Sequence, residues 1–459
     1  MKLGAVSAAV ACGLVVWFCG AAAVLGFLPE SLLPLLASVA IVSTSAALLW
    51  RRWSVEARAI ALATALGLLF SVANGRSMTA PDTQPASEQP WNLLRHATLL
   101  LDGTPALAAH PHAHWIYRRP DGSHASWYPP GMALLAAPVY LPTLLATAPS
   151  EALLSQFEKL AAALLNAGAI LLLGLSLRRA GSSARWIFIG CTLYGLCGSA
   201  LSIQSQALWQ HTGVALALGL VLLASVDAEG RGASALGYAA GLIATIVRPP
   251  DLLLLLPFLS LRSIAQGLSG RRLALAVFLG IGSGAALFGV NNWLLFGAPW
   301  RVGYLIGQGH LGFTFSELPE SLVGLLVSPA HGLLIFVPWL LLLPLVPLPE
   351  ERTARAALSS GLLLLCLMSC WWCWWGAEAF GPRMLAEAQL PLAFAAARAG
   401  PAMSVWSRRT LAALALAGFA THASYLFVLS RDASFHADGA WSARAHPVGH
   451  WLSPGRRAD

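Results

Sequence analysis

Charged residues are scarce in this chain of 459 residues. Only 10% of the residues are Asp, Glu, Lys or Arg, whereas 57% are hydrophobic and the mean hydropathy is +0.67. A soluble domain carries roughly a quarter charged residues, so this composition cannot cover a water-facing surface. Long apolar runs separated by few charges indicate a polytopic membrane protein. Since no polar stretch is long enough to fold alone, we expect one integral membrane domain over residues 1–430 and a polar tail over residues 431–459.

The basic residues are scattered rather than clustered. The net charge of +8 comes mostly from arginines, and only Lys2 and Lys159 are lysine. Nucleic-acid binding requires a basic stripe or patch, so this class of protein is excluded. The apolar run that follows Lys2 is too long for the core of a signal peptide and predicts an uncleaved first helix.

Hydropathy predicts thirteen membrane crossings. They are expected at residues 5–27, 31–50, 58–74, 158–177, 184–203, 211–226, 233–247, 251–262, 273–296, 333–348, 356–375, 385–400 and 407–430. With the N-terminus in the cytoplasm, every predicted inner turn carries arginine, as the positive-inside rule requires. These arginines are Arg51, Arg52, Arg58, Arg178, Arg179, Arg185, Arg231, Arg262, Arg271, Arg272, Arg352, Arg355, Arg398, Arg408 and Arg409. The pattern predicts a multi-pass protein of the cytoplasmic (inner) membrane, with its C-terminal tail outside.

Two apolar segments do not fit a simple crossing. A crossing at residues 131–147 would move Arg178 and Arg179 to the outer side, and prolines interrupt this segment. It is expected to form an interfacial or re-entrant helix on the outer side. Arg248-Pro249-Pro250-Asp251 is expected to form the tip of a hairpin of two broken helices. Irregular backbone at membrane depth is tolerated only where it faces protein or a watery cavity.

Most of the remaining polar residues fall in two outer loops, 75–157 and 297–332. In the first loop Asp82 lies between Pro81 and Pro85, on backbone that the prolines stiffen. A carboxylate just outside a membrane helix can act as a general base toward a hydroxyl that enters from the periplasm. The alternative is that Asp82 only caps the helix expected to begin near Pro85.

The same loop holds candidate metal ligands. His110, His112 and His114 alternate along the chain, so on an extended strand they would share one face. The alternative is a set of solvated loop side chains. Further acids of this loop are Glu88, Asp102 and Asp121. No cofactor is certain from the sequence, and a divalent metal is the one candidate.

Three ionisable residues of later segments are expected near the same face. They are His211, Arg248 and Arg383. An ionisable group at membrane depth is costly and is by default a functional candidate. The alternative for either arginine is that it reaches toward lipid phosphates.

Short motifs occur in a fixed order over about residues 70–390. They are Arg76-Ser77 followed by Asp82-Thr83-Gln84-Pro85, Trp127-Tyr128-Pro129-Pro130-Gly131, Glu158-Lys159-Leu160, Gln206 to His211, Arg248-Pro249-Pro250, Phe296-Gly297-Ala298-Pro299 with Gly303-Tyr304, Gly324 to Gly332, and Trp375 to Arg383. This ordered set resembles the bacterial polytopic glycosyltransferases of the GT-C type. These are lipid-carrier-dependent enzymes related to protein O-mannosyltransferases and aminoarabinose transferases.

The resemblance implies an all-α membrane fold with a large first periplasmic loop that carries juxtamembrane helices. It also implies a catalytic aspartate, matched by Asp82, and a polyprenyl-phosphate sugar as donor. The expected substrate-binding residues are Arg76, Glu88, Tyr128, Lys159, His211, Arg248, Tyr304 and Arg383. The chain departs from the family in two ways. Two crossings precede the helix that leads to Asp82, where better-known relatives have fewer, and the acidic pair often seen in that loop is reduced to Asp82 with Glu88.

Two functions of different classes follow. The first is an inverting glycosyltransferase in which Asp82 deprotonates an acceptor hydroxyl while arginines stabilise the departing lipid phosphate. Its acceptor would be a glycolipid, a cell-wall glycan or a protein. The second is a transporter or flippase that uses the broken hairpin as a substrate site. No internal repeat is evident and the ionisable residues gather at one face, which favours the enzyme; a non-catalytic membrane scaffold ranks third.

Overall fold

The computed structural model describes residues 2–49, 53–226, 232–259, 267–309, 312–347, 350–377, 379–431, 435 and 440–452. Among the predicted inner-turn arginines, Arg51, Arg52, Arg231 and Arg262 lie outside the described residues, as does most of the polar tail.

The chain is built almost entirely from helices. Their order is α1 (Lys2–Val24), η1 (Glu30–Leu32), α2 (Leu33–Leu49), α3 (Val55–Val72), α4 (Gln84–His96), α5 (Pro105–Ala109), β1 (Ile116–Arg118), β2 (His124–Ser126), α6 (Gly131–Tyr140), η3 (Leu141–Leu145), α7 (Glu151–Arg179), α8 (Ala184–Gly195), η4 (Ala200–Gln204), α9 (Gln210–Val226), α10 (Ala233–Val247), η5 (Pro249–Leu255), α12 (Leu268–Phe296), α13 (Gly303–Gln308), α14 (Leu318–Val327), α15 (Leu333–Phe336), η6 (Pro338–Leu345), α16 (Arg352–Ser369), η7 (Arg383–Leu385), α17 (Gln389–Ala399), η8 (Gly400–Ala402), α18 (Val405–Phe427), η9 (Leu429–Arg431), η10 (Ala443–Ala445) and α19 (Pro447–Leu452).

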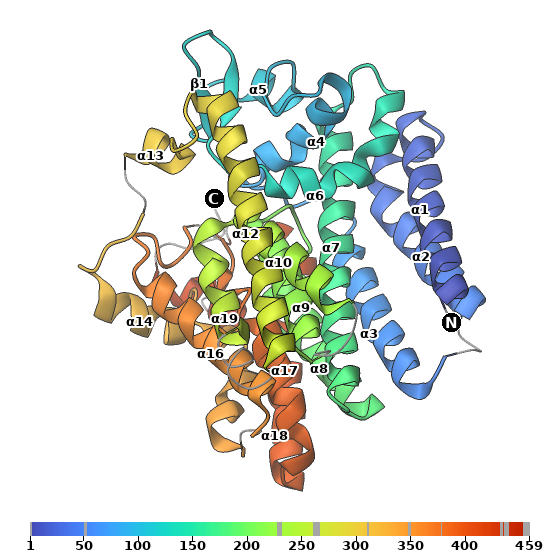
Figure 1. The fold of residues 1–459 in the computed structure, drawn as a ribbon, viewed down its shortest axis with the longest axis vertical. Coiled ribbons are helices and arrows are strands. Elements are labelled where there is room, and N and C mark those ends of the chain that lie inside the picture. Colours follow the sequence, from blue (N-terminus) through green and yellow to red (C-terminus); the bar gives the residue numbers. More distant parts are fainter. Residues whose placement is uncertain are drawn as a thin grey trace.

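Within the described residues, four stretches are long and apolar enough to cross a membrane by length and composition. They are Val55–Val72, Glu151–Arg179, Leu268–Phe296 and Val405–Arg431, and seven further apolar helices of the same described part are shorter. The long helices stand nearly parallel, and α10 packs between α9 and α12 (Figure 1). The chain is therefore a mostly helical membrane protein, as its composition predicts. The count of thirteen crossings stays a prediction.

The mostly helical structure fits the expected all-α membrane fold, with one short antiparallel hairpin of β1 and β2 that is closed by a turn at Gly122, whose φ is +86°. Two expectations about the helices are wrong in detail. The crossing expected at residues 333–348 is broken at Val337, since a residue before proline avoids the helical region. The helix expected at 184–203 ends at Gly195 and is followed by the π-helical η4.

The break expected at Arg248 is present. Helix α10 ends at Val247, Arg248 has an extended φ of −153°, and the two following prolines begin η5. Two prolines in succession remove two backbone donors, so α10 cannot continue through them. The irregular turn places the side chain of Arg248 at the end of the helix.

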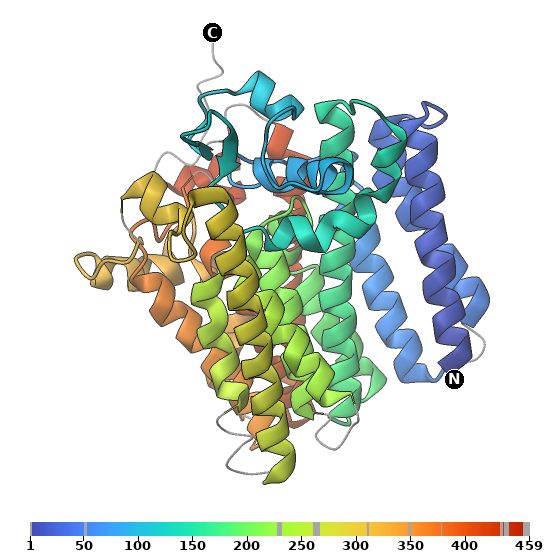
Figure 2. The ribbon, with the colours of Figure 1, turned by 45° about the horizontal axis from the view of Figure 1, so that its top comes forward.

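Two shorter helices lie across the ends of the long ones. Figure 2 shows α4 and α6 crosswise to α3, α7 and α12. Helix α6 contacts α4, α7, α9 and α10. A Cβ at Gly131, the first residue of α6, would lie 2.5 Å from the carbonyl oxygen of Ile246, so only glycine permits this approach to the end of α10. The contact brings the segment that contains Tyr128 close to Arg248.

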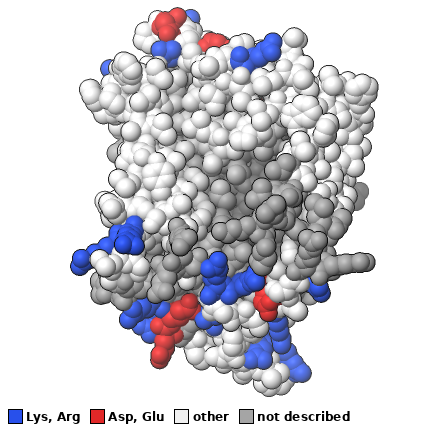
Figure 3. Space-filling model, turned by 45° about the vertical axis from the view of Figure 1, so that its right-hand side comes forward, with Lys and Arg blue, Asp and Glu red and all other residues white. Residues whose placement is uncertain are grey.

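On the face that Figure 3 draws, the charged side chains of the described residues lie toward the two ends of the molecule. Most of the Lys and Arg side chains of this face are at the lower end, further charges are at the top, and the white atoms between them carry no charge. Helix α7 carries Arg178 and Arg179 in its last turn, and α17 carries Arg398 in its last turn. An uncharged belt between charged ends is what a bilayer requires.

Candidate functional site

Asp82 lies in the loop between α3 and α4, and it does not cap a helix. Its Oδ1 accepts a hydrogen bond from the hydroxyl of Tyr128 at 2.6 Å, and its Oδ2 accepts one from Arg383 at 2.7 Å. Thr83 is the N-cap residue of α4 and makes no side-chain cap bond. The capping alternative for Asp82 is therefore wrong, since both of its oxygens face other segments.

The surroundings of Asp82 keep it ionised. Burial raises the pKa of its carboxyl, but the charge of Arg383, the nearby imidazole of His114 and hydrogen bonds from Tyr128 and Arg383 outweigh this and hold the pKa well below its usual range. Burial also raises the pKa of Tyr128, which therefore remains a protonated donor. Nε2 of His114 lies 4.0 Å from Oδ1 of Asp82, which is beyond hydrogen-bond length, and the nearby carboxylate raises the pKa of the imidazole.

A cavity of about 270 Å³ brings most of the expected site residues together. Its lining includes Asp82, Tyr128, His211, Arg248, Tyr304 and Arg383, which come from the first loop, α9, the break after α10, α13 and η7. Side chains of Trp209, Gln210, Trp371, Trp372 and Met384 complete most of the wall. The side chain of Asp82 is 34% exposed and that of His114 is 59% exposed, so the cavity reaches the surface beside them.

Aromatic rings form one wall of this cavity. Tyr304 lies edge-on to Tyr128 at 6.0 Å and to Trp371 at 6.1 Å between ring centroids. A Cβ at Gly303 would lie 2.1 Å from the carbonyl oxygen of Trp127, so the start of α13 packs directly on the chain before Tyr128. Burial raises the pKa of Tyr304 to about 12, and the phenol therefore stays neutral.

Arg383 reaches the cavity from a tight turn. Ala377 has a left-handed φ of +55° and Gly381 has a φ of +62°, which fold the chain back before η7. The guanidinium of Arg383 lies over the ring of Trp209, with Cζ 4.6 Å from the centroid. A cation held on an aromatic face and paired with a carboxylate is fixed in position.

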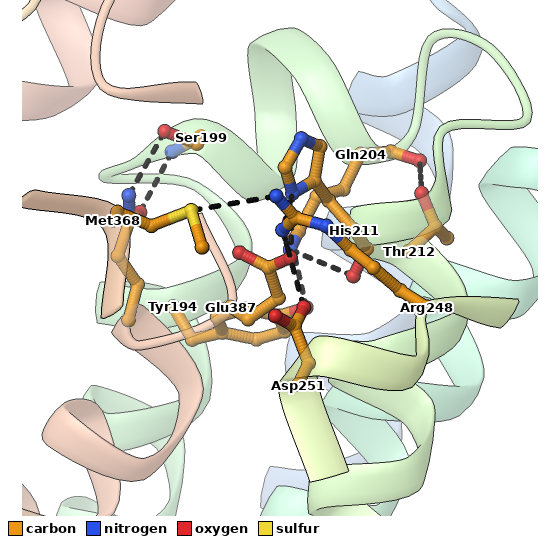
Figure 4. Close-up of polar contacts among 10 residues, drawn as sticks. Tyr194, Ser199, Gln204, His211, Thr212, Arg248, Asp251, Met368 and Glu387 are labelled. Atoms are coloured by element: carbon orange, nitrogen blue, oxygen red, sulfur yellow. Dashed lines mark hydrogen bonds and ion pairs between the residues drawn. The ribbon is translucent and has the colours of Figure 1, made fainter. Parts of the chain in front are cut away.

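Arg248 is held by two buried acids that the sequence analysis did not single out. Its Nη1 donates to Oε1 of Glu387 at 2.9 Å and to Oδ2 of Asp251 at 3.1 Å. Nδ1 of His211 lies 2.5 Å from the same Oε1 of Glu387 (Figure 4). Both acids lie in apolar stretches, so the rule that an intramembrane ionisable group is a functional candidate would have found them.

Three expected binding residues lie outside the cavity lining. Arg76 donates to the backbone carbonyl of Ser430, and Lys159 donates to Oε1 of Gln206 within the buried face of α7. Glu88 is fully buried in α4, where burial raises its pKa to about 8. Within the described ranges, then, the acidic residue nearest in sequence to Asp82 does not share its cavity.

The three alternating histidines do not form a metal site. His110 and His112 are exposed, and His114 turns toward Asp82. In the part of the chain that the structure describes, no group of three or more His, Cys, Asp or Glu residues is arranged to hold a metal ion. A fourth histidine of this loop, His124 at the start of β2, pairs with Asp102 at 2.8 Å.

Comparisons with protein-family models, with curated proteins and with solved structures give no match for this chain. The chemistry of the site therefore rests on the cavity itself, where one carboxylate and two guanidinium groups face the same space.

Proposed function

We propose that this protein is an inverting glycosyltransferase that moves a sugar from a polyprenyl-phosphate donor to a hydroxyl acceptor. The observation that carries the proposal is the cavity in which Asp82 lies with Arg248 and Arg383. An acceptor hydroxyl needs a base, whereas a departing phosphate needs positive charge. The cavity offers both within about 270 Å³.

Asp82 is the group suited to the base. It takes the proton of the acceptor hydroxyl while that oxygen attacks the anomeric carbon from the face opposite the phosphate. In the structure Arg383 weakens Asp82 as a base by lowering its pKa. A phosphate that draws the guanidinium of Arg383 toward itself removes part of this effect, so the base strengthens once the donor is in place.

Arg248 and Arg383 are the groups suited to the phosphate. A polyprenyl phosphate is already a good leaving group, so it requires stabilisation of negative charge more than it requires a proton. Guanidinium groups donate in a planar fork that matches phosphate oxygens. Both side chains line the cavity, and both are positioned by other residues before any ligand arrives.

The charge pattern of the helices supports a site at the outer face of the cytoplasmic membrane. With the arginine-rich helix ends in the cytoplasm, the loop of Asp82 lies on the periplasmic side. The partners are then the lipid-linked sugar, membrane lipids and an acceptor on a glycolipid, a cell-wall glycan or a protein.

A transporter or flippase is the second candidate, and the broken backbone at Arg248 favours it. Discontinuous helices near charged groups are common at transport sites. The two functions differ in one product, because only a transferase releases polyprenyl phosphate from its donor.

The test uses the purified full-length chain in lipid nanodiscs with a panel of short-chain polyprenyl-phosphate sugars and cell-envelope acceptors. We expect acceptor-dependent release of polyprenyl phosphate, and NMR of the product should show an inverted anomeric centre. The Asp82→Asn variant should bind the donor without releasing phosphate. Movement of labelled donor across a proteoliposome bilayer without phosphate release would support the transporter instead.

A further inference from the structure

Four ionisable residues form a buried charge cluster behind the cavity: His211, Arg248, Asp251 and Glu387. The side chains of Asp251 and Glu387 are 0% exposed, while those of His211 and Arg248 are 7% and 12% exposed. His211 and Arg248 line the cavity, whereas the two acids do not. The cluster therefore presents its basic members to the cavity and keeps its carboxylates out of the cavity lining.

The hydrogen bonds assign the proton on the inner nitrogen of His211. Nη1 of Arg248 has two N–H bonds, and Glu387 at 2.9 Å and Asp251 at 3.1 Å are nearer acceptors for them than Nδ1 of His211 at 3.3 Å. Oε1 of Glu387 accepts from Arg248, so Nδ1 of His211, 2.5 Å from that oxygen, is the second donor to it. Nδ1 thus carries hydrogen, and Nε2 is the nitrogen left to bind or lose a proton.

Nε2 of His211 faces away from Glu387. Figure 4 shows the second ring nitrogen directed away from the carboxylate, and no hydrogen bond to it is found among the described residues. Since His211 lines the cavity, a ligand can meet this nitrogen. A carboxylate that holds one imidazole nitrogen while the other faces a substrate is a common arrangement in proton transfer.

The charges around His211 do not balance when its imidazole is neutral. Facing it from the surrounding segments are the acids Asp82, Asp251 and Glu387, the cations Arg248 and Arg383, and the neutral phenol of Tyr304. His114 lies beyond Asp82 at the exposed mouth. Among these described groups, three carboxylates face two guanidinium groups. An entering phosphate adds a further negative charge to a low-dielectric site, which is unfavourable unless a proton accompanies it.

We propose that Glu387 couples binding of the anionic donor to uptake of one proton at Nε2 of His211. This inference rests on the proposed function, because it takes the lipid phosphodiester as the anion. Glu387 acts as a positioning residue: it holds Nδ1–H of His211, directs Nε2 at the cavity, and supplies the negative charge that stabilises the imidazolium. An N–H bond forms at Nε2 with a proton from bulk water as the phosphate enters, and this bond breaks when the phosphate leaves and the proton returns to water. No other covalent bond forms or breaks.

The direct test measures protons taken up on binding. The full-length protein in nanodiscs is titrated calorimetrically with methyl farnesyl phosphate in two buffers of different ionisation enthalpy. This probe is a diester and lacks the second ionisation that monoesters have near pH 6, so it exchanges no proton itself. We expect uptake of about one proton per bound diester, and a Kd that rises by about tenfold per pH unit where uptake is complete. A heat that is the same in both buffers would overturn the inference.

Four variants locate the proton. His211→Gln should abolish uptake, while His112→Gln, at an exposed loop histidine, should retain it. Glu387→Gln keeps the size of the side chain but removes its charge, so uptake should be lost, and the shorter Glu387→Asp should restore part of it. If Glu387 had a purely structural role, the order of proton uptake would be reversed: the isosteric Glu387→Gln variant would be closer to wild type than Glu387→Asp. Persistent uptake in His211→Gln would place the proton on the Asp251–Glu387 carboxyl pair and overturn the inference.

The result separates this inference from the proposed function. Binding with proton uptake but without sugar transfer from any donor would reject the transferase and leave the coupled anion site standing. Sugar transfer by a protein that binds the diester without proton uptake would reject the coupling and leave the transferase standing.

Discussion

Oδ2 of Asp82 lies 2.7 Å from Nη1 of Arg383, although 301 residues separate them in the chain. This ion pair joins the loop between α3 and α4 to the turn before α17. It also sets the acidity of Asp82, because the nearby guanidinium outweighs the effect of burial on the pKa of the carboxyl. The pair therefore makes Asp82 an ionised group at neutral pH and a group whose strength as a base depends on where Arg383 points.

Asp82→Asn should lower turnover by about 10²–10⁴-fold, which is typical for loss of a general base. The amide keeps the shape of the side chain and can still accept hydrogen bonds, but it cannot take a proton. Initial rates of polyprenyl phosphate release would measure the effect. Asp121→Asn, at an exposed position of the same loop, is the matched control and should be fully active. Normal rates in Asp82→Asn would reject Asp82 as the base.

Arg383→Gln should shift the acid limb of the pH–rate profile to higher pH. In the wild type the carboxylate of Asp82 stays ionised well below pH 3.8, so mild acid leaves the base functional. Without the charge of Arg383, burial becomes the dominant influence and raises the pKa of Asp82. The residual kcat/KM of the variant, measured from pH 3 upward, should fall at a higher pH than in the wild type. Coincident acid limbs would mean that Asp82 does not control the rate.

Arg248→Ala should be poorly folded, because it leaves two buried carboxylates without their counter-ion. Breaking a buried pair in this way costs about 3–5 kcal/mol. Arg248→Lys keeps the charge and should express, yet recover only part of the activity because a point charge replaces a planar fork. Yield after purification and turnover of both variants check this, with Arg95→Ala at an exposed position of α4 as control. Full activity of either Arg248 variant would remove Arg248 from the mechanism.

The free energy of unfolding should fall as pH rises, because the buried carboxyl of Glu88 loses its proton. Burial raises the pKa of its carboxyl from 4.5 to about 8 in the folded protein, so the folded state binds more protons than the unfolded state between these values. Stability is then lost progressively over that window as pH increases. Apparent Tm values at pH 5 and pH 8 should differ less for Glu88→Gln than for wild type. An unchanged difference would show that Glu88 does not titrate in this way.

Reporter fusions test the expected topology. A fusion after Arg179 should report a cytoplasmic location, and a fusion after Ala440 should report a periplasmic one, because the arginine-rich turns are retained inside. A periplasmic signal after Arg179 would mean that residues 131–147 cross the membrane, and would put the later loops on the other side.

Composition and local sequence pattern were sufficient to predict the type of protein. The scarcity of charge leaves only a membrane-embedded helical chain, since backbone in lipid must satisfy its own hydrogen bonds. The prolines after Arg248 end α10 where the sequence predicts, and the position of Asp82 just beyond a helix end can be read from hydropathy. Because an ionisable group in an apolar stretch is costly, His211, Arg248 and Arg383 could be identified as functional candidates from the sequence. All three line the cavity.

Only the tertiary structure decided which of these groups meet. Sequence spacing cannot show that Asp82 pairs with Arg383, or that Glu387 holds both His211 and Arg248, because each contact joins segments that are adjacent only after the helices pack. The same packing directs the side chains of Lys159 and Glu88 into the protein interior and away from the cavity. Hydropathy is a property of each residue, whereas the direction of a side chain depends on close approaches such as that of Gly131 to Ile246, which the fold creates.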